Sequence, residues 1–277
     1  MLDEAQDPRV IERQMETVKA VHQVVHIIWL MAQAQLTVVE ETAAETSHYL
    51  DWVDDTVSRL TGEVQPPAIL GNVLHIVFGP ERGYCGSLAR DILAQLPEDG
   101  LLGFVGANLT EQARRHPEIE ARVVFKLAGA TNVAEHEGVA HAVAEEVLRH
   151  GNGPHGAGLP GGVSAVMIHY PPGAGSRLKA AVLLGGERTR VGMPPETLSP
   201  LEEVLDAAVI ELVTGRLAVA AIEALRSEVR ARVAAADRAR QGCDRRHDQL
   251  MTSWRVARQA QITTELLEIV AGHLAAS

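Results

Sequence analysis

Cys85 is the residue of this sequence best placed for nucleophilic chemistry. It lies in the segment Gly79–Leu88 (GPERGYCGSL), where a predicted strand leads into a predicted helix, and a helix N-terminus can activate a thiolate. The G-Y-C-G-S spacing differs from that of a nucleophile elbow, and the sequence places no Asp and His pair beside it. We therefore interpret Cys85 as a small residue packed under the turn, and keep the activated thiol as the alternative.

Two histidine pairs have spacings that raise the question of metal binding. His22 and His26 are four residues apart on one face of a predicted helix, but no third ligand is near them, so we interpret them as a polar break in an apolar face. In the segment HEGVAH, His136 and His141 are five residues apart, so they share no helix face and form no zincin motif. The sequence predicts no metal site.

Glycine-rich segments raise the question of nucleotide binding. Gly79–Leu88 matches neither G-x-G-x-x-G nor G-x-x-x-x-G-K-[ST]. The segment His155–Gly162 (HGAGLPGG) follows a predicted helix and precedes a predicted strand, whereas a phosphate cradle leads into a helix. We expect this segment to be a surface loop. The sequence thus predicts no catalytic residue and no cofactor.

A long N-terminal helix is the first of the elements that carry these residues. Asp7 and Pro8 form a helix start, and no Gly or Pro follows until Gly62, which allows one helix of roughly 50 residues, about 75 Å long. Alternate steps of four and three residues give a mostly apolar stripe, which is typical of a coiled coil. The stripe comprises Ile11, Met15, Val18, His22, Val25, Trp29, Ala32, Leu36, Val39, Ala43, Thr46, Leu50, Val53, Val57 and Leu60.

A second long helix is predicted at the other end, from Ser199-Pro200 onward, and would have about 70 residues and a length of about 105 Å. Its stripe of apolar or small residues comprises Val229, Val233, Ala236, Cys243, His247, Leu250, Trp254 and Ala257, and resumes at Ile262, Leu266 and Ile269. Neither helix can cover its own stripe. We therefore expect the two to pack against each other as an antiparallel coiled coil.

The middle of the chain alternates short apolar runs with helical segments. The predicted strands are Val73–Phe78, Leu101–Val105, Val123–Leu127, Val163–Ile168 and Ala180–Leu184. The predicted helices between the first four strands are Ser87–Leu96, Glu111–His116 and Glu135–Arg149. This alternation implies a parallel, doubly wound, Rossmann-like sheet, and the short last connection implies an antiparallel edge strand. The predicted division is a coiled-coil helix at 1–65, an α/β domain at 66–197 and a second coiled-coil helix at 198–277 that pairs with the first.

Composition excludes several classes of protein. The 277 residues include 25 Lys and Arg against 36 Asp and Glu, a formal net charge of −11, and 3% are aromatic, which disfavours nucleic-acid binding. Two cysteines cannot build a disulfide framework. No apolar run reaches the ~20 residues that a membrane span needs, and the acidic N-terminus is unlike a signal peptide. We expect a cytoplasmic protein that meets a membrane only through a partner.

Arginines are concentrated on the C-terminal helix, between Arg226 and Arg258, whereas the whole chain has only three lysines. One interpretation is a solvated face in a chain that prefers Arg over Lys. The other is a docking surface for an acidic protein partner, bound by guanidinium groups.

Several segments resemble the gamma subunit of F-type ATP synthases. The segment Arg258–Val270 (RQAQITTELLEIV) is similar to the C-terminal signature of that family, and Arg82–Leu88 (RGYCGSL) is similar to its R-G-L-C-G-G-L-N segment. Further matches, each at the corresponding place, are Thr17-Val18-Lys19, Ser227-Glu228, Arg232 and the AAAD run Ala234–Asp237. The resemblance covers essentially the whole chain, in order.

The resemblance implies a rotor subunit without catalytic residues or bound nucleotide. In that family the terminal helices form an antiparallel shaft inside a ring of three alpha and three beta subunits, and the α/β domain contacts the epsilon subunit and the membrane c-ring. Rotation of the shaft drives the beta subunits through their nucleotide-binding states, at the cytoplasmic face of the bacterial inner membrane. The matched residues imply contacts with the catalytic ring at Arg255, Arg258, Gln259 and Thr263, with Cys85 near the lower face of the ring.

The sequence departs from the family in its first helix. That helix is basic in the family, but here the corresponding stretch is nearly uncharged, with Gln23, His26, Trp29, Gln33 and Gln35. Ala89 also replaces the Asn of the family's Cys-Gly segment. These changes suggest a divergent gamma chain, from a standard or an alternate ATPase. Two alternatives stay open: an α/β enzyme that uses Cys85 and dimerises through its terminal helices, and a gamma-like regulator that binds the ring without rotating.

Overall fold

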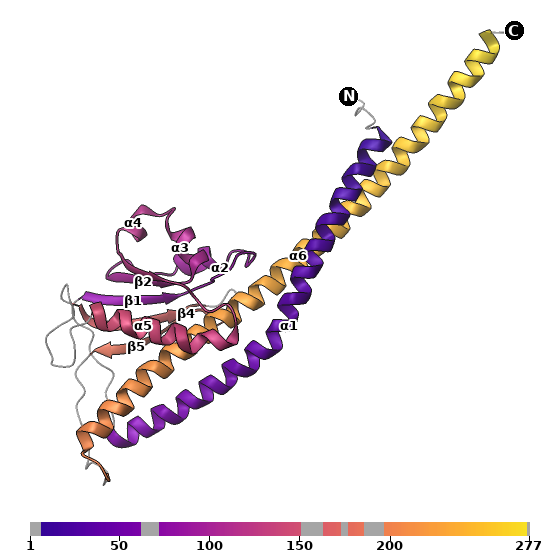
Figure 1. Ribbon diagram of the computed structural model, residues 1–277. Coiled ribbons are helices and arrows are strands. Elements are labelled where there is room, and N and C mark those ends of the chain that lie inside the picture. The colour runs from indigo at the N-terminus through magenta and orange to yellow at the C-terminus, as the bar shows by residue number, and fades with distance from the viewer. Residues whose placement is uncertain (1–6, 62–71, 151–162, 173–176, 186–196, 276–277) are drawn as a thin grey trace. The chain divides into compact units, whose positions relative to one another are not determined.

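The computed structural model describes residues 7–61, 72–150, 163–172, 177–185 and 197–275 (Figure 1). Two long helices, α1 (Pro8–Thr61) and α6 (Leu201–Ala275), have 54 and 75 residues. Along the chain, α1 precedes and α6 follows the strands of a five-stranded sheet. The chain divides into two units, one of Met1–Met31 with Val233–Ser277 and one of Ala32–Arg232. The segment His155–Gly162 lies outside the described residues, so its assignment as a loop stays a prediction.

The sheet has the strand order β3-β2-β1-β4-β5. Its strands are β1 (Asn72–Phe78), β2 (Leu101–Val105), β3 (Val123–Leu127), β4 (Val163–Tyr170) and β5 (Lys179–Gly185). The first four are parallel, and β5 pairs with β4 in the antiparallel sense, both as predicted. Residues 74–78 of the central strand β1 are all buried, as expected for a continuous apolar run inside a parallel sheet.

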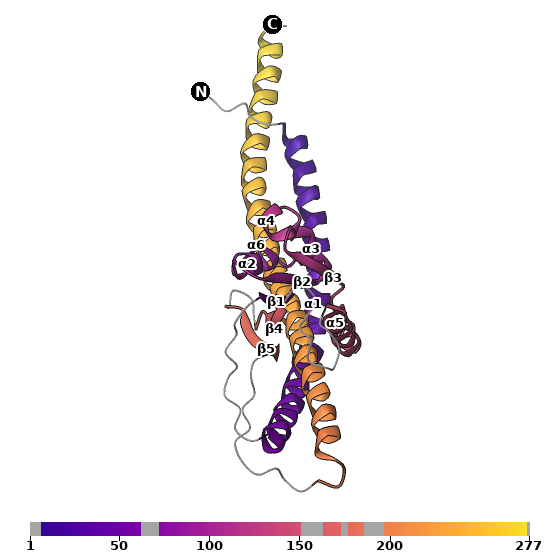
Figure 2. The same ribbon diagram turned by 90° about the vertical axis from the view of Figure 1, so that its left-hand side faces the viewer.

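Helices cover both faces of the sheet (Figures 1 and 2). The short helices between the strands are α2 (Leu88–Leu93), α3 (Ala107–Ala113), α4 (Pro117–Glu120), η1 (Val133–Glu135) and α5 (His136–His150). On one face, Val77, Leu102 and Phe104 pack with apolar residues of α2 and α3. On the other face, Ile76 and Ile168 pack with residues of α5 and of α6. The fold is therefore mixed α/β, as predicted.

The predicted helix Glu111–His116 is wrong in its bounds. Helix α3 begins after Gly106, whose φ of 129° favours glycine, and an added Cβ there would lie 2.7 Å from the backbone oxygen of Gly79. Pro117 then starts the separate helix α4 at its first turn. The β2–β3 connection therefore contains two short helices where one was expected.

Within the unit of residues 32–232, α1 and α6 run antiparallel. Arg230 of α6 pairs with Glu40 of α1 at 2.6 Å, and Arg216 pairs with Asp54 at 2.8 Å. The apolar positions Val39 and Ala43 of α1 pack with residues of α6, as the stripe predicts. This part of α6 also covers the sheet, which is why residues 217–225 are buried without interruption.

Within the other unit, the helices are again antiparallel. The side chain of Asp7 caps α1 by accepting the N–H of Arg9 at 2.9 Å. Ile11 packs with Leu250 and Ala257, and Trp254 donates its indole N–H to Glu12 at 2.8 Å. The three-segment division at 1–65, 66–197 and 198–277 stays a prediction.

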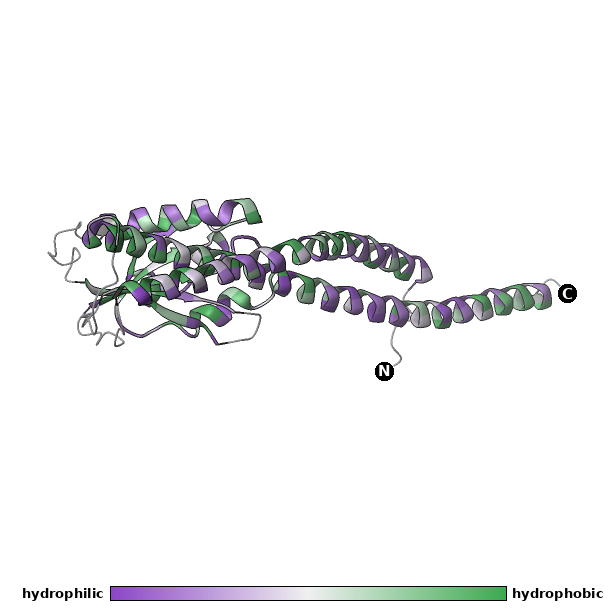
Figure 3. Cartoon of the chain, turned by 90° about the horizontal axis from the view of Figure 1, so that it is seen from below, coloured by the Kyte–Doolittle hydropathy of each residue, from purple (hydrophilic) through white to green (hydrophobic). Residues whose placement is uncertain are grey.

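The stripe expected at Ile262, Leu266 and Ile269 is not packed as predicted, because all three side chains are exposed. In the antiparallel register that places Glu12 beside Trp254, the first residue of α1, Pro8, lies near residue 258 of α6. Among the described residues, α1 thus has none left to cover this stretch. Figure 3 shows hydrophobic residues along this last part of α6.

Candidate functional site

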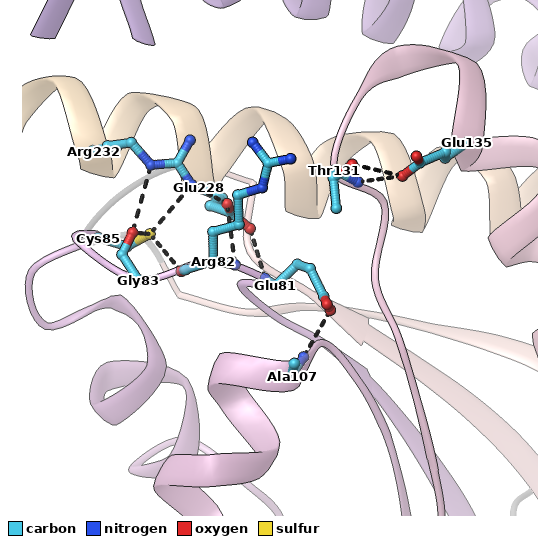
Figure 4. A network of polar contacts seen from close by, with 9 residues as sticks. All are labelled: Glu81, Arg82, Gly83, Cys85, Ala107, Thr131, Glu135, Glu228 and Arg232. Carbon is cyan, nitrogen blue, oxygen red and sulfur yellow. Dashed lines mark hydrogen bonds and ion pairs between the residues drawn. The ribbon is translucent and has the colours of Figure 1, made fainter. Parts of the chain in front are cut away.

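A buried carboxylate of α6 holds the turn between β1 and α2. Glu228 is 1% exposed, and its carboxylate accepts the backbone N–H groups of Glu81 at 2.6 Å and of Arg82 at 3.3 Å (Figure 4). Arg232, one helical turn further on, forms an ion pair with the same carboxylate. Burial raises the pKa of Glu228, while Arg232 and the two N–H donors act in the opposite direction. The conformation of the turn is therefore fixed from the side of the helix.

The side chain of Glu81 fixes the same turn from the side of the sheet. Its Oε2 atom accepts the backbone N–H of Ala107 at 2.8 Å and that of Gly129 at 2.7 Å. These donors follow β2 and β3, at the carboxyl edge of the parallel strands where doubly wound folds bind anionic ligands. A carboxylate of the chain itself thus takes two N–H groups that a phosphate would need.

Cys85 is buried inside this turn. Its thiol lies 3.1 Å from the backbone oxygen of Arg82 and 3.2 Å from that of Gly83. Burial, with the nearby Glu228 carboxylate, raises the pKa of Cys85 to about 12, and Arg232 lowers it only in part. The thiol is protonated at neutral pH, so the structure favours the packing role of Cys85 over the activated thiolate.

Tyr84 is a strongly exposed residue of the turn, in which Arg82, Gly86 and Ser87 are exposed as well. Its side chain is 77% exposed, and its φ of 64° lies in the left-handed region that non-glycine residues rarely adopt. The partner contact expected near Cys85 stays a prediction. The side chain of Cys85 is enclosed, whereas Arg82 and Tyr84 beside it are exposed.

The histidine pairs occupy structural positions. His22 lies 3.3 Å from Asp244 of α6 and stacks on His26, so His22 forms a polar contact between the two helices. His136 and His141 bind backbone oxygens of their own helical region through Nδ1. In the part of the chain that the structure describes, no group of three His, Cys, Asp or Glu residues could hold a metal ion.

The predicted ring contacts lie on the exposed last part of α6. Arg255, Gln259 and Thr263 follow each other at four-residue steps, so they form one stripe, and Arg258 lies beside it. Arg258 donates to Gln261 at 2.9 Å, and the Thr263 hydroxyl donates to the backbone oxygen of Gln259. All four side chains are exposed. The structure therefore brings these residues together on one accessible surface.

Apolar side chains accompany this polar stripe. Those more than half exposed are Val256, Leu266, Leu267, Ile269, Val270 and Leu274. Exposed apolar residues at this density are typical of surfaces that bind other proteins or membranes.

A model of the ATP synthase family matches residues 7–276. The chain belongs to the ATP synthase family. It is 25% identical to the ATP synthase gamma chain of Roseiflexus sp. (strain RS-1), with 95% of this chain and 96% of the relative covered. It is 24% identical to the gamma chain of Heliobacterium modesticaldum, with 95% and 97% covered. The resemblance to gamma subunits that the sequence suggested is confirmed.

The fold also matches a solved ATP synthase chain. A chain of the Euglena gracilis mitochondrial ATP synthase, in a cryo-EM structure of its OSCP, F1 and c-ring, superposes with a TM-score of 0.69. The identity is 16%, and the match covers 97% of this chain and 94% of that one. At this identity the match concerns the fold. No helix among the described residues of this ATP synthase family member combines the length and hydropathy needed to span a membrane.

Two buried pairs of polar side chains in this ATP synthase family member were not predicted from the sequence. Glu228 and Arg232 were noted only as matches to the family, although their four-residue spacing on a helix predicts an ion pair. His75 of β1 and His169 of β4 form a buried pair whose ring nitrogens lie 2.9 Å apart. Burial lowers the pKa of His169 to about 4. The only signals for this pair were that His75 lies inside the predicted strand Val73–Phe78 and that His169 directly follows the predicted strand Val163–Ile168.

Proposed function

We propose that this chain is the gamma subunit of an F1F0 ATP synthase and acts as the rotor of its central stalk. Its partners are the alpha and beta subunits of the catalytic ring, the epsilon subunit and the membrane c-ring. It couples ion flow through the membrane sector to ATP synthesis or hydrolysis in the ring. The observation that carries the proposal is the family match over residues 7–276, which includes both long helices and the sheet between them.

The proposed mechanism is mechanical and uses no catalytic residue of this chain. Helices of 54 and 75 residues are about 80 Å and about 110 Å long. In each unit, antiparallel contacts between α1 and α6 stiffen the pair. A shaft that contacts the three beta subunits differently biases their conformational equilibria, because each conformation has its own contact free energy with the shaft. Rotation then changes which beta subunit receives which contact.

We assign the contacts with the catalytic ring to the exposed last part of α6. Arg255, Arg258, Gln259 and Thr263 supply hydrogen-bond donors and charge, and the neighbouring apolar side chains supply the area that association buries. The turn that carries Cys85 would lie near the lower face of the ring and would contact it through Tyr84.

The proposal also assigns a location and a domain organisation. The chain would be a peripheral protein at the cytoplasmic face of the bacterial inner membrane, attached through the c-ring and not by lipid contact. Residues 1–65 and 198–277 would form the coiled-coil shaft, and residues 66–197 would form the α/β domain beside the c-ring. A regulator that binds the ring without rotating stays the competing interpretation.

Reconstitution with the alpha and beta subunits of the same source tests the proposal. We expect the isolated chain to hydrolyse no ATP and the assembled complex to do so. Arg258→Ala combined with Gln259→Ala should reduce hydrolysis by about tenfold or more, because guanidinium anchors dominate protein interfaces. Arg90→Ala removes an exposed arginine of α2 and should leave the rate unchanged.

The same system separates the rotor from the regulator. Charge reversal at Arg255 and Arg258 should abolish ATP synthesis by membranes that contain the complete enzyme. Synthesis that survives these changes, in a complex that still binds the chain, would support a regulator. Failure of the chain to bind its alpha and beta subunits would overturn both assignments.

A further inference from the structure

A pocket of about 550 Å³ lies between α1, α5 and the first part of α6, within the unit of residues 32–232. This volume is in the range of small-molecule binding sites. None of the residues that line it belongs to the turn of Cys85 or to the exposed last part of α6. Neither the family match nor the proposed rotor function gives it a role.

The hydroxyl groups that line the pocket have already donated their hydrogens. The threonine hydroxyls donate to the backbone oxygen four residues earlier on their own helices, at 2.8 to 2.9 Å; these threonines are Thr42, Thr46 and Thr214. Tyr49 donates its hydroxyl hydrogen to Glu211 at 2.7 Å. The hydroxyls therefore offer lone pairs to a ligand and no free donor.

The imidazoles of the pocket offer acceptors as well. His136 Nδ1 lies 2.5 Å from the backbone oxygen of Val133, which can only accept, so in the neutral imidazole Nδ1 carries the proton and Nε2 carries a lone pair. Nε2 lies 3.5 Å from Thr46 Oγ1, but the Thr46 hydrogen is already donated to Thr42. His136 is 8% exposed, so in this tautomer the Nε2 lone pair is buried beside a hydroxyl that has no second hydrogen to donate. His141 has the same arrangement, with Nδ1 on the backbone oxygen of Glu137 at 2.8 Å.

Three carboxylates line the pocket, and no lysine or arginine does. They are Glu45, Glu137 and Glu211, one from each of the three helices. In the described part of the chain, no lysine or arginine forms an ion pair with any of them. The pocket thus combines negative charge with hydrogen-bond acceptors only, which is the complement of a cation with several N–H donors.

We propose that this pocket binds an organic cation through an alkylammonium or guanidinium group. Glu45, Glu137 and Glu211 balance the charge, and His136 Nε2 accepts one N–H hydrogen deep in the pocket. A metal ion fits less well, because no group of three His, Cys, Asp or Glu residues among the described ones has metal-binding geometry. The cation is either a free polyamine or a Lys or Arg side chain of a partner protein. This proposal does not depend on the rotor function.

Titration of the full chain with defined probes tests the proposal. Spermidine represents the free cation, acetyl-Gly-Lys-Gly-amide and acetyl-Gly-Arg-Gly-amide represent the side chains, and butyrate is the anionic control. Affinity is measured by calorimetry, and the ring-proton NMR signals of His136 and His141 report the location. We expect at least one cation to bind with a dissociation constant below about 1 mM and to shift both signals, and butyrate to do neither.

Neutral variants distinguish the pocket from general attraction to an acidic protein. Each of Glu45→Gln, Glu137→Gln and Glu211→Gln should raise the dissociation constant about two- to fivefold, and the triple variant about tenfold or more. The matched control carries the same charge change at exposed residues outside the pocket, namely Glu41→Gln, Glu118→Gln and Glu203→Gln. It should keep the affinity of the original chain. Because all six side chains are exposed, the variants should fold, which a thermal melt verifies.

The outcomes decide both the chemistry and the source of the cation. Binding of spermidine alone supports a free polyamine, and binding of the peptides alone supports a side chain of a partner. Absence of binding by all three cations at about 10 mM would overturn the proposal. So would an equal loss of affinity in the pocket variants and the control, because the attraction would then come from net charge.

Discussion

Two stretches of the same helix, α6, differ in which side chains they bury. One buries charged side chains, and the other exposes apolar ones. Glu228 and Arg232 are charged and buried, and their partners lie within the chain. Around residues 255–274, apolar side chains such as Ile269 are exposed, at 67%, and charged ones lie beside them. A buried carboxylate is tolerated only where donors compensate its lost hydration, and exposed apolar surface persists where another molecule covers it. The chain itself thus supplies the partners of the first stretch, and we propose that another subunit covers the second.

The largest effect that this comparison predicts is at Glu228. Glu228→Gln removes the charge that Arg232 faces, while it keeps the size of the side chain, so a buried guanidinium is left unpaired. We expect a loss of about 3–5 kcal/mol in the free energy of unfolding, measured by urea denaturation. Glu268→Gln, an exposed change on the same helix, should alter stability by less than about 0.5 kcal/mol.

A second variant identifies the cause. When Arg232→Met is added to Glu228→Gln, no charge remains buried, and part of the lost stability should return. The return should be incomplete, because the N–H groups of Glu81 and Arg82 still face an amide instead of a carboxylate. Losses that simply add up would show that the two side chains act independently, against the network described above.

The second prediction concerns the buried pair His75 and His169. Burial lowers both pKa values, that of His169 to about 4, with Asp99 and Arg122 as weaker influences on His75. An unfolded histidine titrates near 6.5, so between about pH 6.5 and pH 4 the unfolded chain binds protons that the folded chain does not. Stability due to His169 is therefore complete above about pH 6.5 and should fall by up to about 3 kcal/mol as the pH decreases to about 4.

Urea unfolding at a series of pH values measures this effect as a difference between variants. His169→Gln should flatten the acid limb of the profile, since glutamine does not titrate. His48→Gln changes an exposed histidine of α1 and should leave the profile as it was. An acid limb that keeps its slope in His169→Gln would assign the loss of stability to other groups, such as paired carboxylates.

The sequence predicted those parts of the molecule that local patterns determine. Strands β1 to β3 were placed within a residue because buried strands are continuous apolar runs, and α1 and α6 were placed correctly because Gly and Pro are absent from most of their length. The links of Glu81 to Ala107 and Gly129 could not be predicted, since they join residues 26 and 48 positions apart. The exposure of Ile262 could not be predicted either. An apolar stripe shows which face of a helix can pack, but it does not show where the partner helix ends.

The smallest effect on stability is expected where α6 is exposed, and it gives the sharpest test of the comparison. Leu250 and Leu266 lie on the same helix, 4% and 57% exposed respectively. Leu250→Ala should cost about 2–4 kcal/mol, because it opens a cavity against Ile11, whereas Leu266→Ala should change stability by less than about 0.5 kcal/mol. The order of the two variants should reverse in binding to the alpha and beta subunits. At equal amounts of folded chain, Leu266→Ala should bind more weakly than Leu250→Ala. An exposed leucine that matters for neither stability nor binding would contradict the assignment of this surface to a partner.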